Sequence, residues 1–417
     1  MCNVRTLSFL FIGLLIFLPL GVINANPIPV GLLVATEGTY QPFGKEAIRG
    51  AELALAEYYD QLNDNPVELV VENTDGTSKG LKLAVQNLKN NNVRIIVGPL
   101  TGYEGQILRS LAHEMPEIIF VNGSSASPSM TLDNPASNVY RFSGDTIQWL
   151  SGLGEYAYRN KGYKRVITIG EEYSFPYQQI YAFAREFCRS GGSIVSQQWL
   201  FPASKRYDEV VAKIDKTPAD AIFLALGGKD AAYFVQMYRD LGGKLPIIGG
   251  PTSINADFLF YANKAPFHEL GTLTSGPIPG DDDLETWSDF SDFYKSFHNL
   301  KVNGPSLFSY SYYVNMKALL IALEKIEGKI EGKIEESYHL LREELSEIEF
   351  ETPTGEVSLD ENRQGIIDNY IFEVILDSND GIKRSLVSTS SGVEQKSDLW
   401  FDNYSNHLGK NMCGIDK

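Results

Sequence analysis

One stretch near the start of the chain decides the fold: residues 28–59, IPVGLLVATEGTYQPFGKEAIRGAELALAEYY. Its first seven residues form an apolar run, a glycine-containing loop follows, and residues 46–59 carry apolar side chains at helical spacing. A buried strand that leads through a loop into an amphipathic helix is the first half of a βαβ unit. We therefore expect a parallel sheet covered by helices on both faces.

The same alternation continues along the chain and then restarts after Arg141-Phe142, which predicts two doubly wound α/β lobes in tandem. Strand-like runs occupy residues 67–72, 94–97, 117–121, 165–169, 194–199, 220–226 and 246–248. Helical patterns occupy residues 78–88, 102–113, 177–189, 207–214, 230–241, 284–297 and 306–325. Residues 366–376 return to strand composition after this helical block, so the C-terminal part is expected to rejoin an earlier sheet.

Composition bounds the class of protein. The chain has 417 residues, with 36 Lys and Arg against 53 Asp and Glu and a formal charge of −17. Its length fits two or three domains. Nucleic acid demands a basic surface, so the acidic balance argues against a nucleic-acid partner.

The first 25 residues have the pattern of a cleaved secretory signal. Arg5 precedes an apolar run at 9–18, and Ile23-Asn24-Ala25 offers a cleavage site. An uncleaved anchor is the alternative, although about 20 apolar residues are normally needed to span a bilayer. The exported protein keeps Cys188 and Cys413, which form either a disulfide or two separate buried thiols.

Motifs for catalysis and for metal binding are absent from the sequence. The five histidines are scattered, and neither a G-x-S-x-G elbow nor a phosphate-binding Gly-Lys-Ser/Thr loop occurs. This pattern favours a binding protein over an enzyme, with no cofactor and no metal.

Three glycine- and hydroxyl-rich loops follow predicted strands: 36–44, 98–103 and 122–128. Ligands of open α/β sheets sit at the carboxyl ends of strands, and amides at a helix start favour an anion. Singly, Thr101, Ser124 and Ser125 can be helix caps, whereas together the three loops indicate a shared site.

At these residues the chain resembles the type I periplasmic binding proteins, in particular the leucine/isoleucine/valine-binding family that serves ABC importers. The resemblance covers nearly all of the chain after the leader. It rests on residues 28–50, Ile96-Val-Gly-Pro99, 124–128, Tyr140-Arg141-Phe142, 220–226 and Thr352-Pro-Thr-Gly355.

The resemblance implies two α/β lobes that are joined by three crossover strands and close around a small solute. It divides the chain into a leader, a first lobe, a second lobe and a tail. These comprise 1–25; 26–141 with 273–352; 142–272 with 353–400; and 401–417.

Family members that bind amino acids hold the α-carboxylate in the first lobe and pair the ammonium with an acid in the second. Carried over, the first-lobe contacts fall at Phe43, Thr101, Gly102, Tyr103, Ser124, Ser125 and Ala126. Gly102 stands where a serine is usual, and Ala126 stands where a threonine is usual. The second-lobe acid falls near Pro251-Thr252, which cannot neutralise an ammonium, so a zwitterionic amino acid fits poorly.

The second lobe is similar to the subgroup that binds aromatic carboxylates. Phe175 and, on the later helix, Phe308 stand where cleft aromatics are usual; packing in the core is the alternative for both and for Phe43. Lys229, after Gly227-Gly228, either balances a carboxylate or is a surface lysine.

These patterns predict a periplasmic substrate-binding subunit for a small apolar or aromatic carboxylate, with ABC permease subunits as partners. A sensory module of the same fold that serves a signalling receptor is the alternative.

Overall fold

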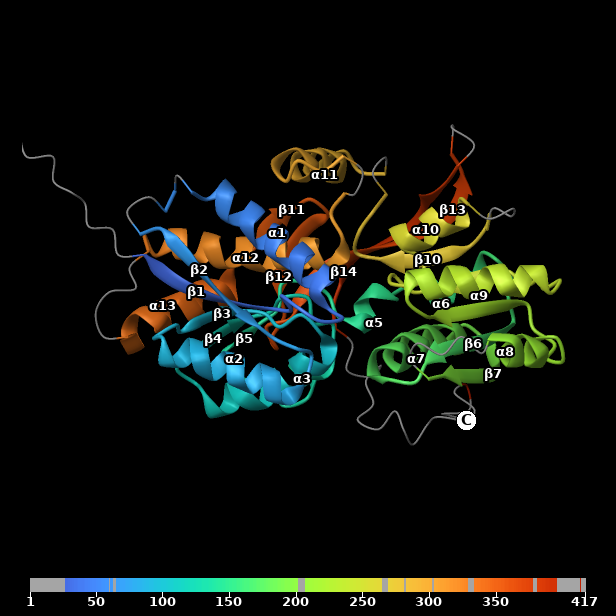
Figure 1. Ribbon diagram of the computed structural model, residues 1–417, viewed down its shortest axis with the longest axis horizontal. Coiled ribbons are helices and arrows are strands. Elements are labelled where there is room, and N and C mark those ends of the chain that lie inside the picture. The colour runs from blue at the N-terminus through green and yellow to red at the C-terminus, as the bar shows by residue number, and fades with distance from the viewer. Residues whose placement is uncertain are drawn as a thin grey trace, which may run out of the picture.

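The computed structural model describes residues 27–59, 61–62, 65–201, 207–264, 269–280, 283–301, 304–328, 334–377, 381–395 and 413. Strands and helices alternate through most of these residues, until three helices between residues 285 and 347 and then four strands between residues 350 and 393 follow one another, and they form two lobes that lie side by side (Figure 1). The predicted leader lies outside the described residues, as does the predicted tail apart from Cys413. No helix in the described part of the chain is long and apolar enough to cross a membrane.

The first lobe is built on a five-stranded parallel sheet with the order β2-β1-β3-β4-β5. Its strands are β1 (Ile28–Val34), β2 (Val67–Asn73), β3 (Ile95–Val97), β4 (Ile119–Val121) and β5 (Val139–Tyr140). The helices beside it are α1 (Gln41–Glu57), α2 (Ser78–Asn90), α3 (Gly102–Glu114), α4 (Ser129–Leu132), α12 (Leu307–Lys325) and α13 (Ile334–Glu347).

Alternate side chains of β1 explain why both faces of this sheet are covered. Val30 and Leu32 belong to the apolar cluster that α1 and α12 share, whereas Leu33 belongs to the cluster with α2 and α3. Successive side chains of a strand point to opposite faces, so an apolar run buries both.

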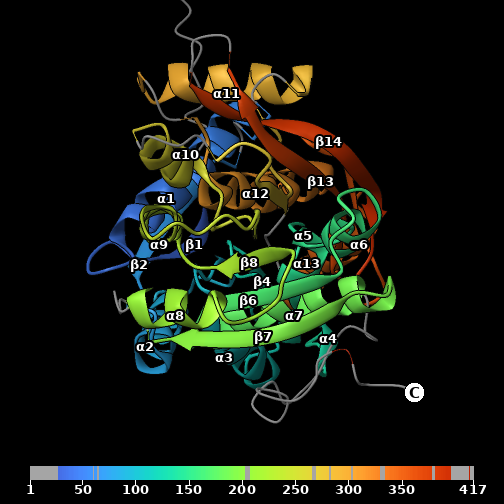
Figure 2. The same cartoon turned by 90° about the vertical axis from the view of Figure 1, so that its right-hand side faces the viewer.

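The second lobe contains a larger, mixed sheet. Strands β10, β9, β8, β6 and β7 are parallel neighbours, and Figure 2 shows β8, β6 and β7 side by side. Beyond β10 the neighbours β13, β12 and β11 pair antiparallel, and β14 pairs antiparallel with β13. The α/β class is confirmed, and so is the late strand, because β13 joins β10. The antiparallel strands are an addition that the prediction of parallel sheets did not include.

The strands of this sheet are β6 (Arg165–Glu171), β7 (Ser193–Leu200), β8 (Ala221–Ala225), β9 (Ile247–Gly249), β10 (Leu273–Gly276), β11 (Phe350–Thr352), β12 (Gly355–Leu359), β13 (Gly365–Leu376) and β14 (Ile382–Val393). The remaining helices are α5 (Thr146–Trp149), α6 (Leu153–Arg159), α7 (Ser174–Arg189), α8 (Tyr207–Ile214), α9 (Gly228–Asp240), α10 (Ala256–Ala262) and α11 (Glu285–Phe297).

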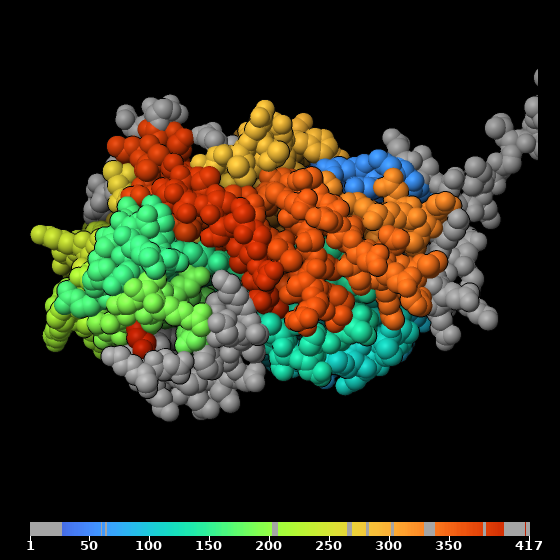
Figure 3. Space-filling view, turned by 180° about the vertical axis from the view of Figure 1, so that it is seen from behind, coloured from blue at the N-terminus to red at the C-terminus, as the bar shows by residue number. Residues whose placement is uncertain are grey.

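The C-terminal strands connect the lobes. Figure 3 shows the surface of residues from about 350 onwards, in orange and red, running from one lobe to the other. The segment after β5 and the segment between β12 and β13 meet, since Arg141 forms a β-bridge with Gln364.

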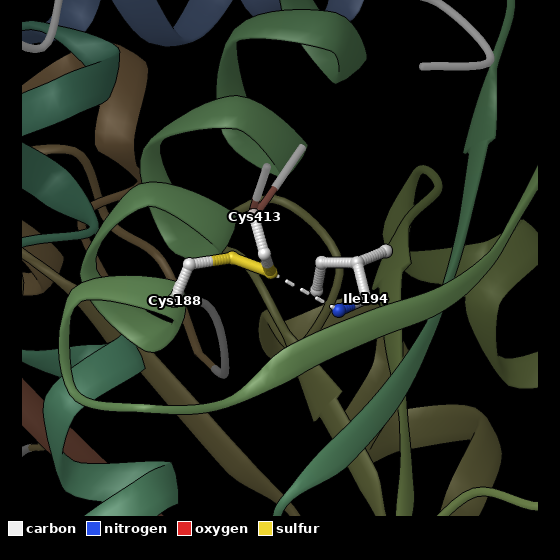
Figure 4. The surroundings of a disulfide bond; sticks show 3 residues. All are labelled: Cys188, Ile194 and Cys413. Carbon is white, nitrogen blue, oxygen red and sulfur yellow. Dashed lines mark hydrogen bonds between the residues drawn. A yellow bond between two sulfur atoms is a disulfide. The ribbon is translucent and has the colours of Figure 1, made fainter. Parts of the chain in front are cut away.

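Two of the three cysteines of the chain are joined. Cys188, at the end of α7, forms a disulfide with Cys413, and their Cα atoms lie 5.1 Å apart (Figure 4). The amide of Ile194 donates a hydrogen bond of 3.3 Å to the Cys413 sulfur. The structure thereby decides between the two alternatives that the sequence left open.

Candidate functional site

The first-lobe residues of the predicted site stand where strands end and helices begin. Phe43 lies on α1, and Phe308 lies at the start of α12. The start of α3 holds Thr101, Gly102 and Tyr103, and the loop after β4 holds Ser124, Ser125 and Ala126. The carboxyl ends of parallel strands lie at one edge of a sheet, which is where such folds bind ligands.

Phe43 and Phe308 are brought together. Their rings stack with centroids 4.4 Å apart and planes 22° apart. Phe43 keeps 38% of its surface exposed, whereas Phe308 packs against the core. The pair therefore offers one open aromatic face backed by a second ring, a platform on which a flat ligand can stack.

Thr101 serves as the N-cap of α3. Its hydroxyl accepts from the Glu104 amide at 3.2 Å and donates to the Glu104 carboxylate at 2.9 Å, and that carboxylate also accepts from the Thr101 amide at 3.1 Å. This reciprocal arrangement is a capping box. The Thr101 hydroxyl hydrogen is therefore already engaged with Glu104 and is not available to a ligand.

Glu104 is fully buried beneath this loop. Burial raises the pKa of the Glu104 carboxyl above its ordinary value, and the hydrogen bonds from Thr101 and from the Gly76 amide act in the opposite direction. The Glu104 carboxylate joins the loop at Gly76 to the loop at Thr101, so its role is to fix the positions of these two loops.

Gly102 and Tyr103 provide the first two amides of α3. These amides have no carbonyl within the helix to bind, and the positive end of the helix dipole favours a negative group there. A Cβ on Gly102 would lie 3.7 Å from the Ser127 amide nitrogen, so this helix start faces the loop that follows β4. Tyr103 is exposed.

The three neighbours in the loop after β4 differ in their contacts. Ser124 donates to the Leu100 carbonyl at 2.8 Å and is tied to the loop after β3. The hydroxyl of Ser125 is fully buried and has no partner among the described residues. Ala126 is buried, and its carbonyl accepts from Thr146 on α5.

Two asparagines that the sequence reasoning missed hold this loop. The side-chain amide of Asn122 donates to the Ser125 carbonyl at 3.1 Å, and the side-chain amide of Asn315 on α12 donates to the Gly123 carbonyl at 3.0 Å. Asn315 is fully buried on α12 between the apolar residues Val314 and Met316, and that sequence position was the available signal.

The second-lobe candidates lie at two helix starts and in one loop. Phe175, near the start of α7, packs against the core. Lys229 is exposed, and its Nζ lies 5.7 Å from the ring centre of Tyr233 and 5.8 Å from that of Tyr261. No contact of the described structure joins it to the first-lobe candidates. Its role towards a carboxylate stays a prediction.

Thr252 follows β9 and accepts a 3.4 Å hydrogen bond from the buried amide of Gln179 on α7. The Gln179 carbonyl oxygen has no partner in the described part of the chain. Gln179 is a second-lobe residue that the sequence reasoning missed, although a buried amide in the apolar face of α7 was a visible signal.

Metal chemistry has no candidate here: the described residues contain no group of three or more His, Cys, Asp or Glu side chains placed to hold an ion.

Two α/β lobes connected by crossover segments, with an aromatic platform and helix-start amides, define a two-lobed solute-binding protein. The family model described as periplasmic binding protein matches residues 27–381, so the chain belongs to that family. The assignment confirms the predicted family and a binding protein rather than an enzyme.

Curated relatives and solved structures agree with it. The chain is 22% identical over 368 residues to a Leu/Ile/Val-binding protein homolog 6 of Brucella melitensis, covering 86% of this chain and 90% of the relative. An ABC transporter substrate-binding protein from Sphaerobacter thermophilus superposes with a TM-score of 0.81 at 22% identity, over 89% of this chain and 100% of that one.

Two further structures contain ligands. A solute-binding protein of an ABC transporter from Rhodopseudomonas palustris, in complex with 3,4-dihydroxybenzoic acid, matches with a TM-score of 0.77 at 20% identity, over 89% and 99% of the two chains. A branched-chain amino acid transporter substrate-binding protein from Streptococcus pneumoniae, in complex with isoleucine, matches with a TM-score of 0.71 at 18% identity, over 87% and 99%. These likenesses show the fold.

Proposed function

We propose that this protein is the exported substrate-binding subunit of an ABC importer, and that it captures a small carboxylate with an apolar or aromatic body. The lobes are proposed to divide near the boundaries given above, except that β10 (Leu273–Gly276) belongs with β9 to the second-lobe sheet, and to close on the solute. The partners are then permease subunits at the inner membrane, and the compartment is the periplasm.

The open face of the Phe43–Phe308 pair carries the proposal. A planar ligand stacked there would gain about 0.5–1.5 kcal/mol beyond its area burial. The amides of Gly102 and Tyr103 at the start of α3 supply the donors for its carboxylate. Because the Thr101 hydroxyl donates to Glu104, we assign the binding of the ligand carboxylate to the backbone amides of Gly102 and Tyr103 and not to the Thr101 side chain.

The second lobe supports a ligand without a compulsory ammonium. The position after β9 holds Pro251 and Thr252, and the nearest side-chain partner of Thr252 is the neutral amide of Gln179. A neutral carbonyl oxygen accepts a hydrogen bond from a hydroxyl but does not balance a buried positive charge. The relative that binds 3,4-dihydroxybenzoic acid has a ligand of this chemistry.

Calorimetric titration tests the assignment. The panel contains benzoate, 4-hydroxybenzoate, 3,4-dihydroxybenzoate, leucine and isoleucine, and we expect heat of binding from the aromatic acids. Strong binding of leucine with none of the aromatic acids would overturn the ligand class. Native mass spectrometry of the purified protein then identifies any ligand that copurifies.

A further inference from the structure

Arg141 is a fully buried cation at the point where the chain leaves the first sheet. Its backbone is fixed to the segment between β12 and β13: the Arg141 amide donates to the Arg363 carbonyl at 3.0 Å, and the Gly365 amide donates to the Arg141 carbonyl at 2.6 Å. A Cβ on Gly365 would lie 2.9 Å from the Phe142 carbonyl carbon, so the two crossover segments are in direct contact.

The guanidinium of Arg141 extends from this junction to the loop of the candidate site. One terminal nitrogen donates to the carbonyls of Ser127 at 2.7 Å and Ser125 at 3.3 Å. The other terminal nitrogen donates to the Thr131 hydroxyl at 2.7 Å, and Nε donates to the Gln364 side-chain oxygen. One side chain thereby links the loop after β4 to the crossover segment that contains Gln364.

The charge at this junction is only partly compensated. The Asp145 carboxylate is fully buried 3.8 Å from Arg141. Burial lowers the pKa of Arg141 to about 10, while Asp145 and Asp360 act in the opposite direction, so the guanidinium stays charged near neutral pH. A buried cation whose nearest carboxylate lies 3.8 Å away depends on its hydrogen-bond acceptors, which here are the two loop carbonyls, the Thr131 hydroxyl and the Gln364 side-chain oxygen.

These contacts also orient the amides of the loop. In a trans peptide the carbonyl and the following amide point in opposite directions. The Ser125 carbonyl points to Arg141, so the amide of Ala126, a predicted ligand contact, points away from Arg141.

We propose that Arg141 is the positioning residue of the site: it holds the loop 123–127 against the crossover segment 363–366, so that binding in the first lobe and movement between the lobes are coupled. The part of this proposal that concerns ligand rests on the proposed function. The part that concerns the two segments stands on the contacts alone.

Hydrogen–deuterium exchange of the ligand-free protein tests the link. We expect Arg141→Met to raise exchange in both 123–127 and 363–366, by about tenfold or more, because a shared anchor is lost. Arg109→Met is the matched control, since Arg109 also donates to backbone carbonyls, of Ser129 and Asp133, but only within the first lobe. We expect it to raise exchange near 129–134 alone. Equal patterns in the two variants would overturn the proposal.

Gln364→Leu provides a second, milder variant if Arg141→Met does not fold. It removes the side-chain oxygen that accepts from Arg141, together with the Gln364 hydrogen bonds to Ser143 and Gln148, and leaves the loop carbonyls as they are. We expect exchange to rise in both segments again. A rise confined to 363–366 would contradict a link through Arg141.

A ligand arm uses 3,4-dihydroxybenzoate as the probe. In the wild-type protein we expect the probe to slow exchange in both segments, and in either variant to slow exchange only in 123–127. Unchanged protection of 363–366 in the variants would contradict coupling. If none of the three aromatic acids binds the wild-type protein, the proposed ligand class fails, and the ligand-free comparison still decides the role of Arg141.

Discussion

The ring of Phe43 on α1 stacks on the ring of Phe308 on α12, with centroids 4.4 Å apart, although the two residues come from opposite ends of the lobe's sequence. The contact is possible because α1 and α12 pack closely, with a Cβ on Gly50 of α1 placed only 1.9 Å from the Ser309 carbonyl oxygen of α12. Helix packing thus creates the aromatic platform.

Removing the platform is expected to weaken ligand binding. Phe43→Ala loses the open aromatic face, and we predict about tenfold weaker affinity for 3,4-dihydroxybenzoate, the equivalent of about 1.4 kcal/mol. Calorimetry measures this effect. Tyr59→Ala is the matched control, because Tyr59 is an exposed aromatic just beyond the other end of α1. Equal affinity of the Phe43 variant and the wild type would contradict a stacking role.

The close packing of α1 on α12 predicts a strong effect of a single methyl group. Gly50→Ala would place its Cβ against the Ser309 carbonyl, which is backbone and cannot move aside cheaply. We predict a loss of about 1–3 kcal/mol in the free energy of unfolding, measured by urea denaturation. Gly227→Ala is the control, since a Cβ there meets nothing within 4 Å. A stable Gly50 variant would show that the helices can separate without cost.

Glu104 predicts a pH dependence of stability. Burial raises its pKa in the folded protein above the ordinary value of 4.5. The folded protein therefore binds the proton more tightly than the unfolded chain, and the charged carboxylate costs stability as the pH rises through this window. We expect Glu104→Gln to gain stability relative to the wild type between pH 4.5 and neutral pH.

Urea unfolding at a series of pH values measures this difference. Glu114→Gln, at the exposed end of the same helix, is the matched control. A wild-type protein that gains stability relative to Glu104→Gln as the pH rises would contradict the direction of the shift.

Because of the disulfide, we expect the stability of the fold to depend on reducing agent. Cys188 and Cys413 are 225 positions apart in the sequence, so the bond restricts a large part of the unfolded chain. We predict that reduction lowers the free energy of unfolding by about 2–5 kcal/mol. Denaturation with and without dithiothreitol measures the loss, and Cys188→Ser should no longer respond to the reductant. Equal stability of the oxidised and reduced forms would contradict the prediction.

Much of the fold could be predicted from the sequence because the signals are local. Residues 28–59 alternate a buried strand with an amphipathic helix, and β1 and α1 occur within that stretch. The hairpin of β13 and β14 was not predicted in full, because antiparallel pairing depends on a partner strand.

The sequence predicted which loops form the candidate site but not the side-chain contacts within it. Thr101 and Glu104 have the spacing of a capping box, so the cap was visible in the sequence, and the structure shows that the Thr101 hydroxyl makes it. Gln179 and Arg141 lie far in sequence from the residues they hold, Thr252 and Gln364. Such contacts leave no spacing that a sequence pattern can reveal.

The sequence by itself determined the family through the order and spacing of its motifs. It determined the α/β class and the two lobes through apolar runs that alternate with segments of helical spacing. Only the tertiary structure decided the disulfide, the aromatic pair and the buried Arg141 junction. Each of these joins groups from distant parts of the chain, and their geometry exists only after the lobes have packed.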